Sequence, residues 1–195
     1  MNRLFWKYYI VLVSSLVFLS CSEGNSIKRQ ISKMCEREIM INTDDMVACH
    51  VLDSLSTNEK DSKLKMVLWA DSTECSQCYI RNLDLWKGYA NIEREIPKGI
   101  VFYFIFETAP EKMGKIFSLI QTTQLNHTIY VDTAQVFRRN NPNIPTDVLY
   151  HTFLLDSNNK VILVGNPTKN KSIRYLFNEI LNENLNITVY NEDSF

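Results

Sequence analysis

The segment from Met66 to Cys78 limits the possible folds more than any other part of the sequence. It begins with the apolar run Met66–Ala70, which is typical of a buried strand, and continues through a polar turn to Cys75 and Cys78. Apolar residues then recur at helical spacing at Ile80, Leu83, Trp86, Tyr89 and Ile92. A Cys-x-x-Cys pair placed between a strand and a helix favours redox chemistry over a purely structural use of the thiols.

The position of the two cysteines assigns them different expected roles. Backbone N–H groups and the dipole at the start of a helix stabilise a thiolate, which is the nucleophilic form of cysteine. We therefore expect Cys75 to be the attacking thiol and Cys78, one helical turn later, to be the resolving thiol. Glu74 acts in the opposite direction, because a neighbouring negative charge raises the pKa of a thiol.

The rest of the chain predicts an α/β domain with three layers and a central mixed sheet. Strands are expected at 65–70, 100–106, 128–132, 152–155 and 161–164, and the last two form a hairpin. Helices are expected from the cysteines to about 95, over 110–121 and 134–139, and around 173–181. Before this domain we expect a helix over 27–39 and a pair of short strands, 39–41 and 47–52, joined by a turn.

The N-terminus has the layout of a secretory signal peptide. Arg3 and Lys7 precede the apolar run Ile10–Leu19, and this run is far shorter than the ~20 residues that span a bilayer. Phe18-Leu19-Ser20-Cys21 resembles a bacterial lipobox, in which the cysteine is lipidated. The sequence thus predicts a protein anchored in the cell envelope by a lipid on Cys21, facing the periplasm or the cell surface.

These features divide the 195 residues into four parts. Residues 1–20 are the expected lipoprotein signal peptide, and 21–63 hold a tether, a helix and the short strand pair. The α/β domain covers 64–185, and 186–195 form a C-terminal tail. The formal net charge of −1 is spread without basic clusters, so we expect no nucleic-acid partner.

From Lys65 to Leu181 the order of elements resembles the thioredoxin-like superfamily, in particular its extracytoplasmic branch of membrane-tethered thiol–disulfide reductases and peroxiredoxin-related domains. The segment Thr152–Asp156, together with Asn159–Ile162 and Gly165, resembles the hairpin of that branch. Trp69-Ala70 resembles its approach to the active site, and the ending Gly165-Asn166-Pro167 is similar to thioredoxin-like lipoproteins of the Bacteroidetes. The resemblance implies a docking edge formed by Trp69, Glu74, Tyr150 and His151.

The sequence departs from that family at the position of its cis-proline. Counting back from Phe153 places this position at Tyr150, followed by His151, so we expect a trans peptide and altered docking. Val67 stands where thioredoxin has a buried acid. The peroxidase pattern is incomplete as well, because Leu68 occupies its proline position although Ser72 stands three residues before Cys75.

Three functions follow from these observations. The first is a thiol–disulfide oxidoreductase that exchanges a Cys75–Cys78 disulfide with an envelope protein and needs no cofactor. The second is a binding or scaffold module in which the two cysteines form a permanent disulfide. The third is delivery of copper or zinc by Cys75, Cys78 and His151, against which stands the simpler expectation that His151 faces solvent or makes one ordinary hydrogen bond.

The remaining cysteines and histidines are expected to be structural. Cys35 and Cys49 form a disulfide with each other or remain two small buried thiols, and the sequence leaves both alternatives open. His50 lies in a strand-like context and His127 in a loop-like context, and both receive a structural interpretation.

Overall fold

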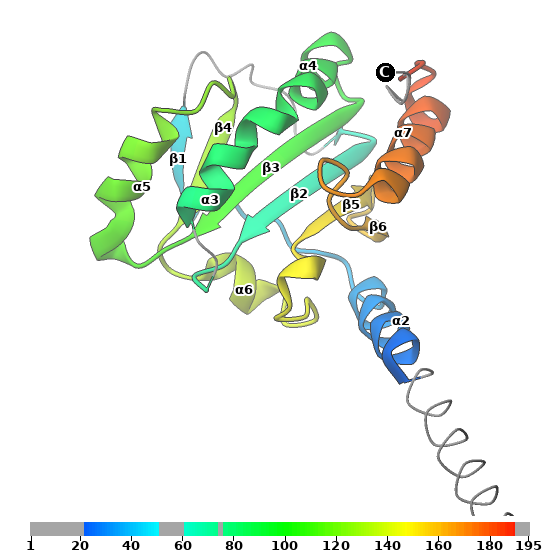
Figure 1. Cartoon of the computed structure of the whole chain (residues 1–195), viewed down its shortest axis with the longest axis horizontal. Coiled ribbons are helices and arrows are strands. Elements are labelled where there is room, and N and C mark those ends of the chain that lie inside the picture. The colour runs from blue at the N-terminus through cyan, green and yellow to red at the C-terminus, as the bar shows by residue number, and fades with distance from the viewer. Residues whose placement is uncertain (1–21, 51–60, 74–75, 190–195) are drawn as a thin grey trace, which may run out of the picture.

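A computed structural model describes residues 22–50, 61–73 and 76–189 of the chain. Within these ranges the molecule is built around one mixed sheet of six strands in the order β1-β4-β3-β2-β5-β6. Figure 1 shows helices lying across both faces of this sheet. The architecture is that of an α/β thioredoxin-like domain with a central mixed sheet, which confirms the predicted fold class.

The strands form wherever the sequence has a continuous apolar run. They are β1 (Val47–His50), β2 (Leu64–Ala70), β3 (Ile100–Glu107), β4 (Thr128–Asp132), β5 (Thr152–Asp156) and β6 (Val161–Val164). The two central strands, β2 and β3, are parallel and buried at every residue, as expected for strands covered on both faces. β4 runs parallel to β3, whereas β1, β5 and β6 are antiparallel to their neighbours.

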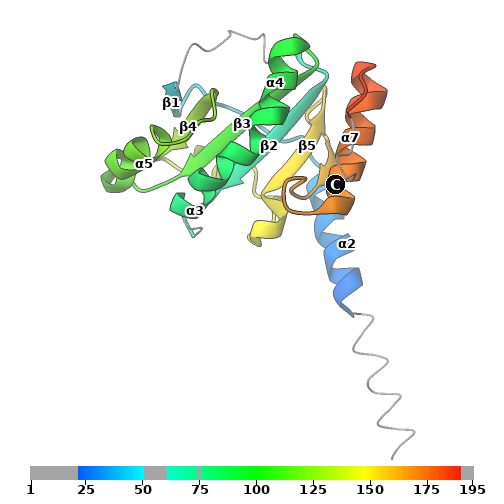
Figure 2. The same cartoon turned by 45° about the horizontal axis from the view of Figure 1, so that its top comes forward.

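The helices divide between the two faces of the sheet. One face packs against α3 (Ser76–Arg81), η2 (Asn82–Trp86), α4 (Lys87–Glu95), α5 (Met113–Ile120) and α7 (Lys171–Leu185). The other face packs against α2 (Ser22–Cys35) and α6 (Val136–Asn140). In the turned view of Figure 2, α7 and α4 can be distinguished from the strands of the sheet. Alternate residues of β2 and β3 enter the two cores, as the two-residue period of a strand requires.

The segment Ile39–Ile41 is not a strand, so the expected strand pair is wrong in its first member. Its backbone is satisfied by the Asn141 side chain, which accepts a hydrogen bond from Met40 N at 2.8 Å and donates one to Met40 O at 3.0 Å. β1 pairs instead with β4. The last residues of the predicted strand, Val51 and Leu52, lie outside the described residues.

The long helix expected after the cysteines is interrupted. It consists of the six-residue α3, the 3₁₀ turn η2 and α4, which ends at Glu95 just before Pro97. Asp84 lies in the 3₁₀ turn, and its side chain accepts hydrogen bonds from Thr123 Oγ1 and Gln124 N, both at 2.9 Å. These contacts hold η2 against the loop that follows α5.

The helix predicted over 27–39 is α2, which begins and ends several residues earlier, at Ser22 and Cys35. The remaining predicted elements occur close to their expected bounds. The short helix η3 (Pro110–Lys112) leads into α5, and η4 (Val148–Tyr150) leads into the β5–β6 hairpin. Gly165 ends the hairpin with a φ of 129°, and a Cβ there would lie 3.0 Å from the Ile173 side chain. Among the described helices, none combines the length and apolarity that a membrane crossing requires.

Candidate functional site

The sequence places the Cys-x-x-Cys segment after β2, and the structure has β2 end at Ala70 and α3 begin at Ser76. Cys78 is in the first turn of α3, and its side chain is exposed. Glu74 and Cys75 fall outside the described residues, as does Cys21. The structure therefore places Cys78 and the residues that frame the segment.

Asp71 anchors the chain as it leaves β2. Its carboxylate is 1% exposed, and Oδ1 accepts hydrogen bonds from Thr73 N at 2.9 Å and Thr73 Oγ1 at 2.6 Å. This is the geometry with which an aspartate starts a tight turn. The turn directs the chain toward α3 and so helps to position Cys78.

Arg138 of α6 connects Asp71 to the end of β3. Its Nη2 donates to Asp71 Oδ2 at 2.9 Å, and its Nε donates to Glu107 Oε2 at 3.1 Å. Both carboxylate side chains are 1% exposed, whereas that of Arg138 is 31% exposed. The three residues form a buried charge cluster at the carboxyl end of the parallel strands, which we call the Arg138 cluster.

The pKa values of the Arg138 cluster reflect burial opposed by hydrogen bonds. Burial favours the neutral form of Asp71, but the bonds from Thr73 and Arg138 outweigh it and lower the pKa of Asp71 below its ordinary value. Burial likewise acts to lower the pKa of Arg138, and its bonds to Asp71 and Glu107 reverse that effect and raise it. Both groups are consequently charged at neutral pH.

Trp69 contacts both Arg138 and His151. The guanidinium carbon of Arg138 is 4.9 Å from the centroid of the indole ring, and the imidazole centroid is 4.3 Å away. Trp69 is 2% exposed and its Nε1 makes no hydrogen bond to a described residue. The side chain is therefore part of the core, and the docking role expected for Trp69 does not agree with its burial.

Tyr150 and His151 occupy the position of the missing proline, but their side chains point into the protein. Tyr150 is 5% exposed and His151 is fully buried, with Nε2 3.1 Å from Pro145 O. The expectation of one ordinary hydrogen bond for His151 holds, and the alternative that it faces solvent is wrong. The described backbone contains no cis peptide bond, in agreement with the trans peptide expected here. The exposed neighbours Val148 and Leu149 are the apolar surface of this loop.

His151 is poorly placed to act as a metal ligand. Its Nε2 faces a backbone carbonyl and its ring is covered on one side by Trp69. In the described part of the chain, no group of three or more His, Cys, Asp or Glu side chains could hold a metal ion. His127 is structural, as predicted, because its Nε2 lies 2.8 Å from the buried Glu93 carboxylate.

Cys35 and Cys49 are free thiols at opposite edges of the sheet. Cys49 belongs to edge strand β1, and the Sγ of Cys35 donates to Val161 O in edge strand β6 at 3.6 Å. Five strand spacings of about 4.8 Å separate these edges, or roughly 24 Å, whereas the Cα atoms of a disulfide are less than about 7 Å apart. The intramolecular disulfide is therefore excluded. The second alternative is right that both thiols are free and wrong that they are buried, because Cys35 is exposed and Cys49 is partly exposed.

Sequence reasoning missed the Arg138 cluster, although a signal for it was present. Asp71, Glu107 and Asp132 each stand at the end of a buried apolar run. The carboxyl ends of parallel strands meet at one edge of a sheet, so these carboxylates had to lie near one another and needed a cation. Nothing in the pattern identifies Arg138 as that cation, since it pairs with Asp71 across 67 residues of sequence.

Comparisons with known proteins do not assign the chain to a family. No protein-family model matches the sequence, and neither does any curated protein. A thiol:disulfide interchange protein DsbE from Chlorobium tepidum is 15% identical over 63% of this chain and 82% of its own, with a TM-score of 0.43. A thioredoxin-like protein from Porphyromonas gingivalis is 18% identical over 66% and 79%, with a TM-score of 0.42. A thiol-disulfide isomerase domain from Cytophaga hutchinsonii is 18% identical over 62% and 78%, with a TM-score of 0.40. These similarities are distant, and they concern the thioredoxin-like fold alone.

Proposed function

We propose that the protein is a thiol–disulfide oxidoreductase of the cell envelope that uses Cys75 and Cys78. The observation that carries this proposal is the exposed side chain of Cys78 in the first turn of α3, at the edge of the sheet where β2 ends. Structural cysteines are usually buried and inert, whereas reactive cysteines lie in partly exposed surroundings. Asp71 and Arg138 act as positioning residues, because they fix the turn that leads into the cysteine segment.

The proposed reaction moves two electrons between the cysteine pair and a partner. The Cys75 thiolate attacks one sulfur of a partner disulfide, so that a mixed disulfide forms and the second partner sulfur leaves as a thiolate. The thiolate of Cys78 then attacks the Cys75 sulfur, closes the Cys75–Cys78 disulfide and releases the first partner sulfur. The partner is reduced and the pair is oxidised. The same steps in reverse oxidise a partner dithiol, and the relative reduction potentials decide the direction.

The interrupted helix affects how strongly Cys75 is activated. The amide groups that favour a thiolate belong to the six-residue α3 rather than to one long helix. Glu74 adds a negative charge beside the nucleophile and raises the pKa of its thiol. We therefore propose slower exchange than in a thioredoxin with a continuous helix and no neighbouring acid.

Attachment to the membrane through a lipid on Cys21 forms part of the proposal. α2 begins at Ser22, directly after the expected lipidated residue, and joins the sheet through Met34, which is fully buried. A lipid on Cys21 would thus be connected to the folded domain by one helix. Labelling of growing cells with a radioactive fatty acid tests this: wild type should carry the label, and Cys21→Ser should lose it.

A scaffold function is the second candidate, favoured by the burial of the expected docking side chains. The side chains of Tyr150 and His151 are not exposed. The buried position that holds an acid in thioredoxin is occupied here by Val67, which has no carboxyl group. In this case the cysteine pair is a permanent structural disulfide. Its reduction potential would then lie below about −300 mV, the range of disulfides that resist reduction by thiols.

Reduction of insulin by dithiothreitol separates the two candidates. If the protein is an oxidoreductase, wild type accelerates insulin precipitation, and Cys75→Ser abolishes that acceleration. A Cys35→Ser variant is the matched control and keeps the activity, since Cys35 lies at the far edge of the sheet. If wild type gives no acceleration and the pair has a potential below about −300 mV, the scaffold function is correct.

A further inference from the structure

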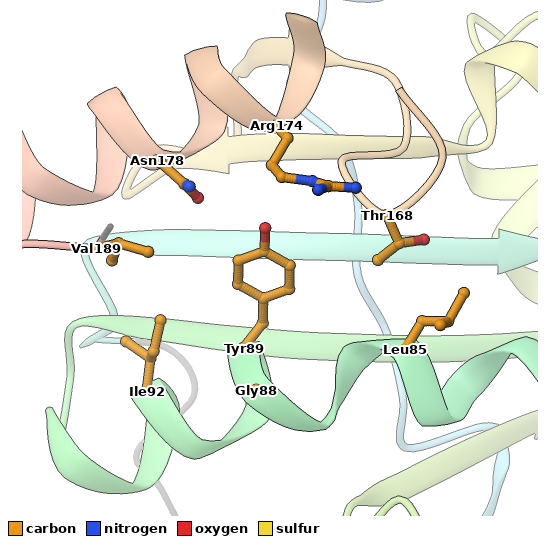
Figure 3. A pocket seen from close by; sticks show the side chains of 8 residues that line it. All are labelled: Leu85, Gly88, Tyr89, Ile92, Thr168, Arg174, Asn178 and Val189. Carbon is orange, nitrogen blue, oxygen red and sulfur yellow. The ribbon is translucent and has the colours of Figure 1, made fainter. Parts of the chain in front are cut away.

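A cavity of about 490 Å³ lies between α4 and α7. Its residues come from η2, α4, α7 and the segments on either side of α7, and none belongs to the Cys-x-x-Cys motif. Figure 3 shows the side chains of both helices converging on this space. Ligand sites in proteins are typically cavities of this size with an apolar lining and a few polar groups. We refer to it as the α4–α7 cavity.

Three polar side chains meet at the α7 side of the α4–α7 cavity. Tyr89 extends from α4 toward α7, and Arg174 and Asn178 of α7 lie on either side of its hydroxyl group (Figure 3). The ring of Tyr89 is fixed by an edge-to-face contact with Phe177, with centroids 5.1 Å apart. These groups are therefore held in place by the packing of the two helices.

Arg174 brings a positive charge to the cavity. Its Nε donates to Pro167 O at 3.0 Å, which orients the guanidinium group, and the side chain is half-buried. Within the described ranges, no carboxylate forms an ion pair with Arg174. A partly desolvated cation without a counter-ion favours an anionic ligand, and the planar guanidinium matches the two oxygens of a carboxylate.

The hydroxyl group of Tyr89 is suited to donate a hydrogen bond to such an anion. Burial raises the pKa of Tyr89, and the smaller effect of the Arg174 charge acts in the opposite direction. The hydroxyl thus remains protonated at neutral pH. A carboxylate between Tyr89 and Arg174 would accept one neutral and one charged hydrogen bond.

The rest of the lining is mostly apolar. Besides the polar side chain of Thr168 it consists of Leu85, Ile92 and Val189, and Leu85 is 56% exposed although it is a large hydrophobic residue. Gly88 opens the wall of α4, because a Cβ built there meets no atom within 4 Å. The combination of one cation and several apolar side chains disfavours inorganic phosphate or sulfate, which carry two charges and have no apolar part.

We propose that the α4–α7 cavity binds a small amphipathic monocarboxylate, with its carboxylate against Arg174 and Tyr89 and its hydrocarbon chain against Leu85, Ile92 and Val189. This site is separate from the proposed redox function, since it uses neither Cys75 nor Cys78. Its test therefore does not depend on whether the cysteines exchange electrons.

Calorimetric titration of the full-length protein with hexanoate at pH 7.5 tests the proposal. Butanoate, hexanoate and octanoate should bind with affinities that rise about fourfold per added methylene group. Hexan-1-ol has the same chain length without the charge, and it should bind at least tenfold more weakly than hexanoate. The proposal is wrong if the alcohol and the acid bind equally well. It is also wrong if millimolar protein binds no hexanoate when hexanoate is present at 50-fold molar excess.

Two variants, each with a matched control, assign the binding to this cavity. Arg174→Gln should weaken hexanoate binding by about tenfold or more, and Tyr89→Phe by about fivefold. The matched controls are Arg94→Gln on α4 and Tyr175→Phe on α7, both at exposed positions outside the cavity, and neither should change the affinity. If Arg174→Gln binds hexanoate as wild type does, the proposed site is wrong.

Gly88→Phe provides a test that does not remove a polar contact. The new side chain enters open space and replaces glycine inside a helix, so the fold is retained, as circular dichroism can verify. Because the phenyl ring occupies the cavity, hexanoate binding should be lost. Unchanged binding in a folded Gly88→Phe protein would show that hexanoate binds elsewhere and would overturn the assignment.

Discussion

Arg138 and Asp71 form a salt bridge in which Nη2 and Oδ2 are 2.9 Å apart, and the carboxylate is almost completely buried. The same guanidinium also binds Glu107 and covers the face of Trp69. One side chain of the short helix α6 thus neutralises the ends of two central strands beside the cysteine segment. The fold of the site depends on this contact more than on any feature visible in a single stretch of sequence.

Replacement of Arg138 by methionine should lower the free energy of unfolding by about 3 kcal/mol, because two buried carboxylates lose their only described cation. This value is at the lower end for broken buried pairs, since Arg138 is itself 31% exposed. Urea denaturation followed by circular dichroism measures it. The neighbouring Arg139 is exposed, and Arg139→Met should change stability by less than about 0.5 kcal/mol. Similar losses for both variants would contradict the role of Arg138.

Stability should fall in acid through Asp71. Its pKa is lower in the folded protein than its ordinary value, so the ionised form stabilises the fold. This contribution is present above about pH 4 and is lost as the pH falls through the folded-state pKa. Asp71→Asn should therefore flatten the decline of unfolding free energy below pH 4. Asp61→Asn removes a carboxylate from an exposed ion pair and should leave the decline unchanged.

Asp132 should stabilise the start of α6, which carries Arg138. Its fully buried carboxylate accepts hydrogen bonds from Ala134 N at 3.2 Å, Val136 N at 3.0 Å and Phe137 N at 2.9 Å. Asp132→Ala leaves these donors without an acceptor and should lower stability by about 2 kcal/mol. Asp147→Ala removes one exposed bond to Leu149 N and should lower it by less than about 1 kcal/mol. Thermal unfolding of the two variants provides the comparison.

Cys35 and Cys49 should remain reduced thiols of low reactivity. Burial raises the pKa of both thiols above the usual value, so little thiolate is present at neutral pH. Alkylation by iodoacetamide, quantified by mass spectrometry of peptides, should be slow at pH 7 and increase steeply above pH 9. A peptide in which Cys35 is disulfide-bonded to Cys49 would contradict the sheet order, which places them at opposite edges.

The sequence predicts the strands well because each buried strand corresponds to a continuous apolar run. β2, β3 and β4 occur almost residue for residue where those runs occur. The sequence does not predict pairing partners equally well. An apolar triplet such as Ile39–Ile41 does not reveal which groups form hydrogen bonds with its backbone. Here Asn141, about a hundred residues later, supplies both hydrogen bonds to Met40. Local propensity cannot indicate such a contact.

The sequence predicts the location of the candidate site but not the side-chain contacts that surround it. The strand, turn and Cys-x-x-Cys identify where the chemistry belongs, and Cys78 is exposed at that place. The docking role given to Tyr150 and His151 comes from counting positions, which fixes the location of a residue but not the direction of its side chain. His151 turns inward because it stacks on Trp69 and bonds Pro145 O.

Trapping with a Cys78→Ser variant tests the proposed electron exchange most directly. Without the resolving thiol, a mixed disulfide between Cys75 and a partner cannot be released by the second step. We predict that Cys78→Ser, expressed in the native envelope, accumulates covalent adducts with other proteins that dithiothreitol reduces. The Cys75→Ser/Cys78→Ser double variant should form none. If the single variant accumulates no adducts, or the double variant accumulates as many, Cys75 is not an exchanging nucleophile and the proposed function is wrong.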